Sequence, residues 1–131
     1  MTDKKVIIWQ RVEGLALLVL AVSIFHSMWG NWWFFAATFL LPDLGMLGYL
    51  VNKRVGAWCY NLSHTLILPV VVAVIGIFGG GSSIDSGSGL FLVAMIWFAH
   101  IGFDRMLGYG LKYDDGFKHT HLGIIGKKKH D

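Results

Sequence analysis

The chain of 131 residues is long enough for one domain, and 55% of its residues are hydrophobic while only 15% are charged. A soluble domain of this length usually has about a quarter of its residues charged, so the composition argues against an ordinary soluble protein. The net charge of +3 comes from basic residues dispersed between apolar runs, which a bilayer explains better than a nucleic acid does. The lone Cys59 excludes an internal disulfide and a cysteine metal cluster.

Four apolar runs, separated by polar connections, follow one another along the chain. A helix needs about 20 mostly apolar residues to cross a bilayer. We therefore expect membrane-spanning helices over residues 11–28, 32–51, 55–77 and 90–107, followed by a tail over residues 108–131. Because three more runs follow the first, we expect the first to be retained rather than cleaved as a signal peptide. Residues 1–131 are predicted to form a single all-α transmembrane domain, a four-helix bundle.

The basic residues predict the orientation of these spans. All eleven Lys and Arg residues fall at the N-terminus, in the connection that holds Lys53 and Arg54, or from Arg105 onward. In a four-span chain these three regions lie on one side of the membrane, and the positive-inside rule makes that side cytoplasmic. Both termini are therefore expected on the cytoplasmic side.

Several ionisable residues lie inside the predicted spans, where each costs roughly 2.5–3.5 kcal/mol on insertion scales. With a helical rise of ~1.5 Å per residue, Asp43, His64 and His100 lie roughly 10–13 Å from the cytoplasmic ends of their spans, and Asp104 is shallower. His100 and Asp104 are four residues apart, so they project from one face of a helix. Pro42 is expected to bend the second span and to free a backbone carbonyl near this cluster.

The residue types in the cluster favour a divalent metal. Zinc accepts imidazole nitrogen and carboxylate oxygen, and manganese or iron would suit the same donors. A metal could then activate a bound water as hydroxide. The plainer interpretation is that these residues only form hydrogen bonds between helices and fix their packing. The candidate metal ligands are Asp43, His64, His100 and Asp104.

Five further polar residues are candidates for a supporting role near the same face: Glu13, Asn61, Arg105, His119 and His121. Glu13 is expected either to be a further ligand or to pair with Arg105. Arg105 either anchors its span at the interface or binds an anionic group such as phosphate. His119 and His121 would cover the cytoplasmic mouth if the tail folds back onto the bundle. The alternative is a solvated basic tail that touches anionic lipid.

The stretch from His100 to Gly123 resembles the signature of a family of small bacterial membrane proteins. It reads His-Ile-Gly-Phe-Asp-Arg-Met-Leu-Gly-Tyr-Gly-Leu-Lys-Tyr and continues to Thr-His-Leu-Gly. The family is known as domain of unknown function 4260, and the likeness extends over nearly the whole chain. This resemblance implies a multi-pass protein of the bacterial inner (plasma) membrane, and it does not imply an activity.

A looser similarity connects the chain with membrane-bound metal-dependent hydrolases, which include the inner-membrane protein that binds the LexA repressor. It rests on Leu-Pro-Asp at residues 41–43, Ser-His-Thr at residues 63–65 and His-x-x-x-Asp at residues 100–104. The resemblance implies that the four candidate ligands hold a metal. The chain has Gly45 where that family has a second aspartate, and Ser-His-Thr where it has Thr-His-Ser. These departures bear on catalysis more than on metal binding.

Three functions remain open. The first is a metal-dependent hydrolase at the cytoplasmic face that acts on a lipid-like or phosphate-ester substrate. The second is a small transporter or proton relay, a role that intramembrane Asp and His residues serve elsewhere. A four-span unit is small for a transport path, so we expect a homo-oligomer, most simply a dimer. The third is a structural or interaction protein whose polar cluster only fixes helix packing. No nucleic-acid partner is expected.

Overall fold

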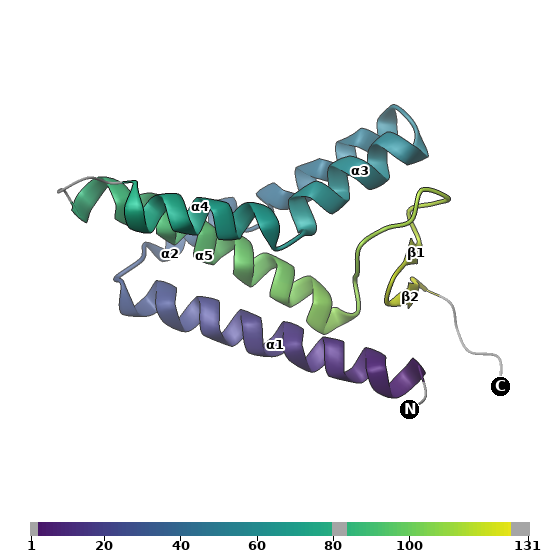
Figure 1. Cartoon of the computed structure of the whole chain (residues 1–131), viewed down its shortest axis with the longest axis horizontal. Coiled ribbons are helices and arrows are strands. Elements are labelled where there is room, and N and C mark those ends of the chain that lie inside the picture. The colour runs from purple at the N-terminus through teal and green to yellow at the C-terminus, as the bar shows by residue number, and fades with distance from the viewer. Residues whose placement is uncertain (1–2, 80–83, 127–131) are drawn as a thin grey trace.

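Two long, uninterrupted helices, α1 (Asp3–Ser27) and α5 (Ile84–Leu107), pack side by side in the computed structural model, which describes residues 3–79 and 84–126 (Figure 1). They approach closely through glycines. A Cβ atom on Gly102 would lie only 2.7 Å from the carbonyl oxygen of Gly14 and from the backbone nitrogen of Leu18. Small residues at such crossings allow the backbones of membrane helices to come into contact.

The second apolar segment is broken near its middle, where the sequence predicted a single bent helix over residues 32–51. It forms α2 (Trp32–Thr38) and then a 3-10 helix, η1 (Leu41–Leu50). Pro42 accounts for the break, because it has no N–H to donate to the carbonyl of Thr38 and its ring collides with that carbonyl. A 3-10 helix of ten residues is unusual, since runs beyond 3–4 residues are uncommon.

The third apolar segment is also broken, where the sequence predicted a continuous helix over residues 55–77. It forms α3 (Lys53–His64) and α4 (Ile67–Phe78), and Thr65 between them is extended, with ψ at 153°. Pro69 follows Thr65 by four residues and leaves its carbonyl without a helical donor. A proline therefore explains each of the two breaks.

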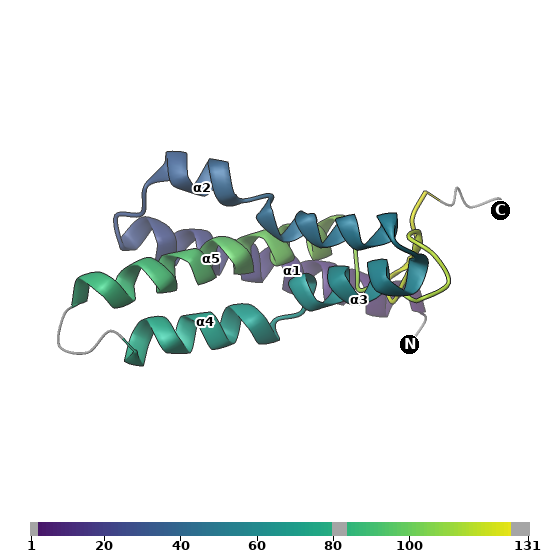
Figure 2. The same cartoon turned by 90° about the horizontal axis from the view of Figure 1, so that it is seen from above.

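The broken segments lie next to each other. η1 packs against α3, while α4 packs against α5, so that the hairpin of η1 and α3 turns away from the line of α4 at the breaks (Figures 1 and 2). The described parts of the two termini lie at the same end of the molecule in both views. Beside this end, the C-terminal segment forms a small antiparallel hairpin of β1 (His119–Thr120) and β2 (Gly123–Ile124).

Four segments are apolar and long enough to cross a membrane: Asp3–Ser27, Trp32–Leu50, Lys53–Phe78 and Gly89–Leu107. Their buried core, where α1, α4 and α5 meet, contains Phe25, Ala73, Ala94, Met95 and Ile96. Many large apolar side chains are exposed on the outside of the helices, among them Leu20, Leu44, Ile67, Val74 and Phe103. The prediction of an all-helical chain with four apolar segments of membrane-spanning length is therefore confirmed.

Candidate metal centre

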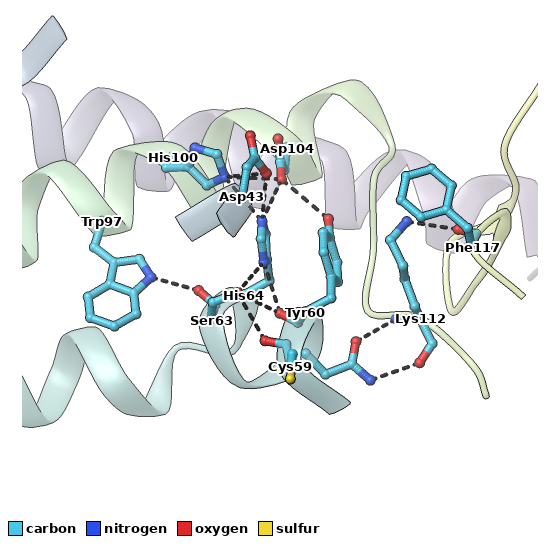
Figure 3. Close-up of polar contacts among 11 residues, drawn as sticks. Asp43, Cys59, Tyr60, Ser63, His64, Trp97, His100, Asp104, Lys112 and Phe117 are labelled. Atoms are coloured by element: carbon cyan, nitrogen blue, oxygen red, sulfur yellow. Dashed lines mark hydrogen bonds and ion pairs between the residues drawn. The ribbon is translucent and has the colours of Figure 1, made fainter. Parts of the chain in front are cut away.

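The four candidate ligands come together at the level of the two helix breaks (Figure 3). Asp43 lies in the first turn of η1, just after the first break. His64 is the last residue of α3, just before the second break. His100 and Asp104 lie one turn apart on the continuous α5. The consecutive elements η1 and α3 and the distant helix α5 thus each supply part of one group.

The spacing of the donor atoms is close to that of a tetrahedral metal site. Nε2 of His64 lies 3.1 Å from Nε2 of His100, 3.2 Å from Oδ1 of Asp43 and 3.3 Å from Oδ2 of Asp104. Nε2 of His100 lies 3.3 Å and 3.4 Å from the same two oxygens. Zinc at about 2.0–2.2 Å from its ligands holds them roughly 3.3–3.6 Å apart in a tetrahedron. All four donor atoms lie within 4.8 Å of one another.

The charge of the group also favours a cation. His64 and His100 are buried, with 4% and 1% of their surface exposed, and the side chains of Asp43 and Asp104 are 29% and 15% exposed. Two ionised carboxylates in largely apolar surroundings repel each other and lose hydration. A divalent cation would neutralise both carboxylates at once, and it would also accept the lone pairs of the two imidazole nitrogens.

Residues around the group orient His64. Its Nδ1 lies 2.9 Å from the carbonyl oxygen of Tyr60, and a proton on Nδ1 donated to that carbonyl leaves the lone pair of Nε2 facing the other ligands. The Tyr60 ring stacks on the imidazole with 3.7 Å between centroids, and its hydroxyl donates a long hydrogen bond of 3.5 Å to Asp104. Nδ1 of His100 is buried with no hydrogen-bond partner among the described residues, and the ring packs edge-on against Phe39.

Trp97 stabilises the helix break beside His64. The end of α3 leaves carbonyl groups without helical donors. Nε1 of Trp97, on α5, donates a 2.6 Å hydrogen bond to the carbonyl oxygen of Ser63. The roles of Trp97 and Tyr60 could not be predicted from the sequence, since an aromatic residue in an apolar run carries no signal of its partner.

Gly45 lies where the similar hydrolases have a second aspartate. A Cβ atom at this position would be 2.5 Å from the hydroxyl of Ser63 and 2.8 Å from the carbonyl oxygen of Cys59. The close packing of η1 on α3 therefore leaves no room for a side chain there, and position 45 could not supply a fifth ligand without separating the two helices.

Asn61 attaches the C-terminal segment to the bundle. Its side-chain oxygen accepts a 2.6 Å hydrogen bond from the backbone nitrogen of Lys112, and its side-chain nitrogen donates a 2.8 Å hydrogen bond to the carbonyl of the same residue. Lys112 also forms an isolated antiparallel bridge with Thr120. The segment is therefore folded back onto the helices, one of the two arrangements considered from the sequence.

The two tail histidines form contacts within the tail. His119 hydrogen-bonds Asp115 at 2.8 Å on the surface, which lowers the pKa of that carboxyl. Nδ1 of His121 accepts a hydrogen bond from the backbone nitrogen of Leu111, and burial lowers the pKa of His121. In the described part of the chain, neither histidine belongs to the four-residue group or lines the cavities beside it.

Glu13 and Arg105 also lie outside the four-residue group. Glu13 is exposed on α1. Arg105 is partly buried on α5 and lines a pocket of only about 10 Å³ next to Tyr60 and Asp104. Such a pocket holds about one water molecule, so a phosphate group would not fit there.

Two larger cavities lie near the group; one is lined by two of its members and the other by their sequence neighbours Pro42 and Ser63. The first, which we call the tail chamber, has a volume of about 250 Å³ and is lined by Asp43, Met46, Tyr60, Asp104, Tyr109, Lys112, Phe117 and Ile125. The second, which we call the apolar groove, has a volume of about 340 Å³ and is lined by Phe34, Thr38, Leu41, Pro42, Gly45, Ser63, Val93, Ile96 and Trp97. Figure 3 shows Trp97 and Lys112 on opposite sides of His64, so the group lies between the two cavities.

Comparison with known proteins gives one match. A family model described as "Domain of unknown function (DUF4260)" matches residues 7–125. No similar protein was found among curated proteins or among solved structures.

Proposed function

The chain belongs to the DUF4260 family, and from the geometry of its site we propose that it is a multi-pass membrane protein that binds one divalent metal ion. Asp43, His64, His100 and Asp104 would be the ligands. The observation that carries the proposal is the set of five donor-atom distances between 3.1 Å and 3.4 Å, from three separate elements. Zinc suits two imidazoles and two carboxylates in this arrangement, and manganese or iron accepts the same donors.

We further propose that the site hydrolyses an ester. A bound metal would lower the pKa of a water molecule and stabilise the charge that develops on the substrate. Asp43 and Asp104 line the tail chamber, so water and substrate would reach the site from that side. His64 would be held in its binding tautomer by the carbonyl of Tyr60. With four protein ligands, hydrolysis requires that the coordination expand to five or that one carboxylate move aside.

The two cavities support a lipid-like or phosphate-ester substrate. The apolar groove lies among segments that are long and apolar enough to cross a membrane, and it offers a place for an acyl chain. The tail chamber carries the charged and aromatic side chains that a polar head would contact. A molecule that extends from one cavity to the other would pass the metal site. We propose that this occurs near the cytoplasmic face of a bacterial inner membrane, as the basic residues predict.

Metal binding is tested by elemental mass spectrometry of the detergent-purified full chain. We expect about one zinc, manganese or iron ion per chain in the wild type and its loss in both His100→Ala and Asp43→Ala. His26→Ala is the matched control, because His26 is exposed on α1 and lies outside the four-residue group. Wild-type protein without metal, even after reconstitution, would contradict the proposal and favour a proton relay or a packing role for the cluster.

Hydrolysis is tested on the same preparations with a chromogenic phosphate ester and a fluorescent phospholipid. We expect turnover that a chelator abolishes and that the metal restores. His26→Ala should retain this activity. A metal-loaded wild type that turns over neither substrate would restrict the proposal to metal binding.

A further inference from the structure

Lys112 is buried in the tail chamber, although lysines are rarely buried unless their charge is paired. Only 5% of its surface is exposed. Its ammonium donates one hydrogen bond of 2.8 Å to the carbonyl of Phe117 and lies 4.5 Å and 3.8 Å from the ring centroids of Tyr60 and Phe117. Within the described ranges, no carboxylate lies within 4.0 Å of it. An ammonium has three donors, and the carbonyl of Phe117 is the one hydrogen-bond acceptor that it has among the described residues.

The backbone of Lys112 is fixed on both sides. Asn61 binds its N–H and its carbonyl, and the bridge to Thr120 holds it from the opposite edge. The two aromatic rings confine the side chain as well. The charge is therefore held at one place in the chamber, unlike that of an exposed lysine, which moves freely. Burial lowers the pKa of Lys112, and the carboxylates of Asp104 and Asp43 oppose this effect.

The balance of charge in the chamber indicates what the ammonium would bind. The lining contains the two carboxylates of Asp43 and Asp104 and the one cation of Lys112. A divalent metal would neutralise the carboxylates and leave one net positive charge, on the ammonium of Lys112. Such a chamber attracts an anion, and phosphate oxygens bind both a divalent metal and a lysine ammonium.

We infer that Lys112 is the anion-binding residue of this site and that the substrate carries a phosphate group, held between Lys112 and the metal. The inference rests on the proposed metal site. Arg105, the anion-binding candidate from the sequence, lines a pocket too small for phosphate, whereas the tail chamber has a volume of about 250 Å³. The volume is large enough for a phosphate group and part of its ester.

If Lys112 had a purely structural role, its substitution would have a different effect. If Lys112 only fills the space between Tyr60 and Phe117, then Lys112→Met should preserve every property of the site, because methionine is flexible and packs well on aromatic rings. Lys112→Gln retains an N–H donor on a shorter side chain and loses the charge. Lys118→Met is the matched control, since Lys118 is an exposed lysine of the same tail.

The experiment is calorimetric titration of metal-loaded protein with inorganic phosphate, with metal content measured on each sample. We expect Lys112→Met and Lys112→Gln to keep the metal and to bind phosphate at least about tenfold more weakly, while Lys118→Met binds it normally. As a measurement that needs no variant, phosphate should protect Lys112 of the wild type from acylation and leave Lys118 unprotected.

Two results would overturn the inference. Unchanged phosphate binding in metal-loaded Lys112→Met and Lys112→Gln, or acylation of Lys112 that phosphate does not slow, would remove the role of Lys112 and leave the metal site standing. A wild type that holds no metal would remove the proposed function and this inference with it. The metal content of the samples separates the two cases.

The source of the phosphate group is decided by a second titration in detergent micelles. Phosphatidic acid should bind more tightly than diacylglycerol with the same acyl chains, and this preference should fall at least about tenfold in Lys112→Met, in which only the metal still holds the phosphate. Tight binding of phosphatidic acid with weak binding of inorganic phosphate would assign a lipid head group. Comparable binding of both would assign free phosphate esters. Equal binding of phosphatidic acid and diacylglycerol by the wild type would contradict the inference.

Discussion

His64 shows how single residues build the site. It is the last residue of α3, so its backbone lies at a helix end. Nδ1 of its ring contacts the carbonyl of Tyr60, and Nε2 faces the other candidate ligands. The ring of Tyr60 stacks on the imidazole at an interplanar angle of 11°. Ligand orientation by such surrounding residues commonly changes metal affinity by about 10–100-fold.

Two substitutions of Tyr60 distinguish the contribution of its ring to metal affinity from the contribution of its hydroxyl. Tyr60→Phe removes only the 3.5 Å hydrogen bond to Asp104, which is at the limit of useful length, so we expect metal affinity to change by less than about tenfold. Tyr60→Ala removes the stacked ring, and we expect a loss of about 10–100-fold. Competition with a chromogenic chelator measures both. Equal affinities of Tyr60→Ala and the wild type would show that the ring does not orient His64.

The continuous helix α5 and the two broken segments position their candidate ligands in different ways. α5 is continuous and presents His100 and Asp104 from one face, and its close contact with α1 holds it in position. The other two ligands come from segments that are each broken at a proline, and Trp97 satisfies a carbonyl that the end of α3 leaves free. Irregular backbone at membrane depth is tolerated only where protein or a water-filled cavity surrounds it, so these breaks are expected beside a site.

Two glycines of α5 allow a matched test of the contact between α1 and α5. At Gly102 a Cβ atom would meet backbone atoms of α1 at 2.7 Å, so Gly102→Ala should force the helices apart and destabilise the fold by about 1–3 kcal/mol. At Gly89 a Cβ atom would meet nothing within 4 Å, so Gly89→Ala should be neutral or stabilising by up to ~1 kcal/mol. Thermal unfolding in detergent measures both, and equal effects would contradict this packing.

At the scale of the whole molecule, the described chain ends and the end of α4 lie at opposite ends of the long axis. The described ends of the chain lie together at one end, beside the folded tail and the tail chamber (Figure 1). This arrangement agrees with an even number of membrane crossings, and the basic residues predict which end faces the cytoplasm.

Reporter fusions in a bacterial host test that orientation. Green fluorescent protein fused after Asp131 should fluoresce, and alkaline phosphatase at the same point should be inactive, because both ends are predicted to be cytoplasmic. Alkaline phosphatase fused after Phe78, at the end of α4, should be active. The reverse pattern would mean that the positive-inside rule is not obeyed, and it would place the tail chamber on the outer side.

The sequence by itself determined the four apolar helical segments and the similar depth of Asp43, His64 and His100. Hydropathy and the rise of a helix are local properties, so counting residues is enough to find them. The metal role of these residues stays a prediction. The break at Pro42 was only partly foreseen, as a bend, and the break before Pro69 was missed, because a proline in a membrane helix can produce either a kink or an interruption.

Only the tertiary structure decided which side chains meet. It brought Asp43, His64, His100 and Asp104 within 4.8 Å of one another and turned His119 and His121 to partners within the tail. It also placed Lys112, which nothing in the sequence distinguishes from the other tail lysines, in the chamber beside the group. The physical reason is that these contacts join segments separated by tens of residues. The rotation of each helix about its axis and the path of the tail depend on packing along the whole chain.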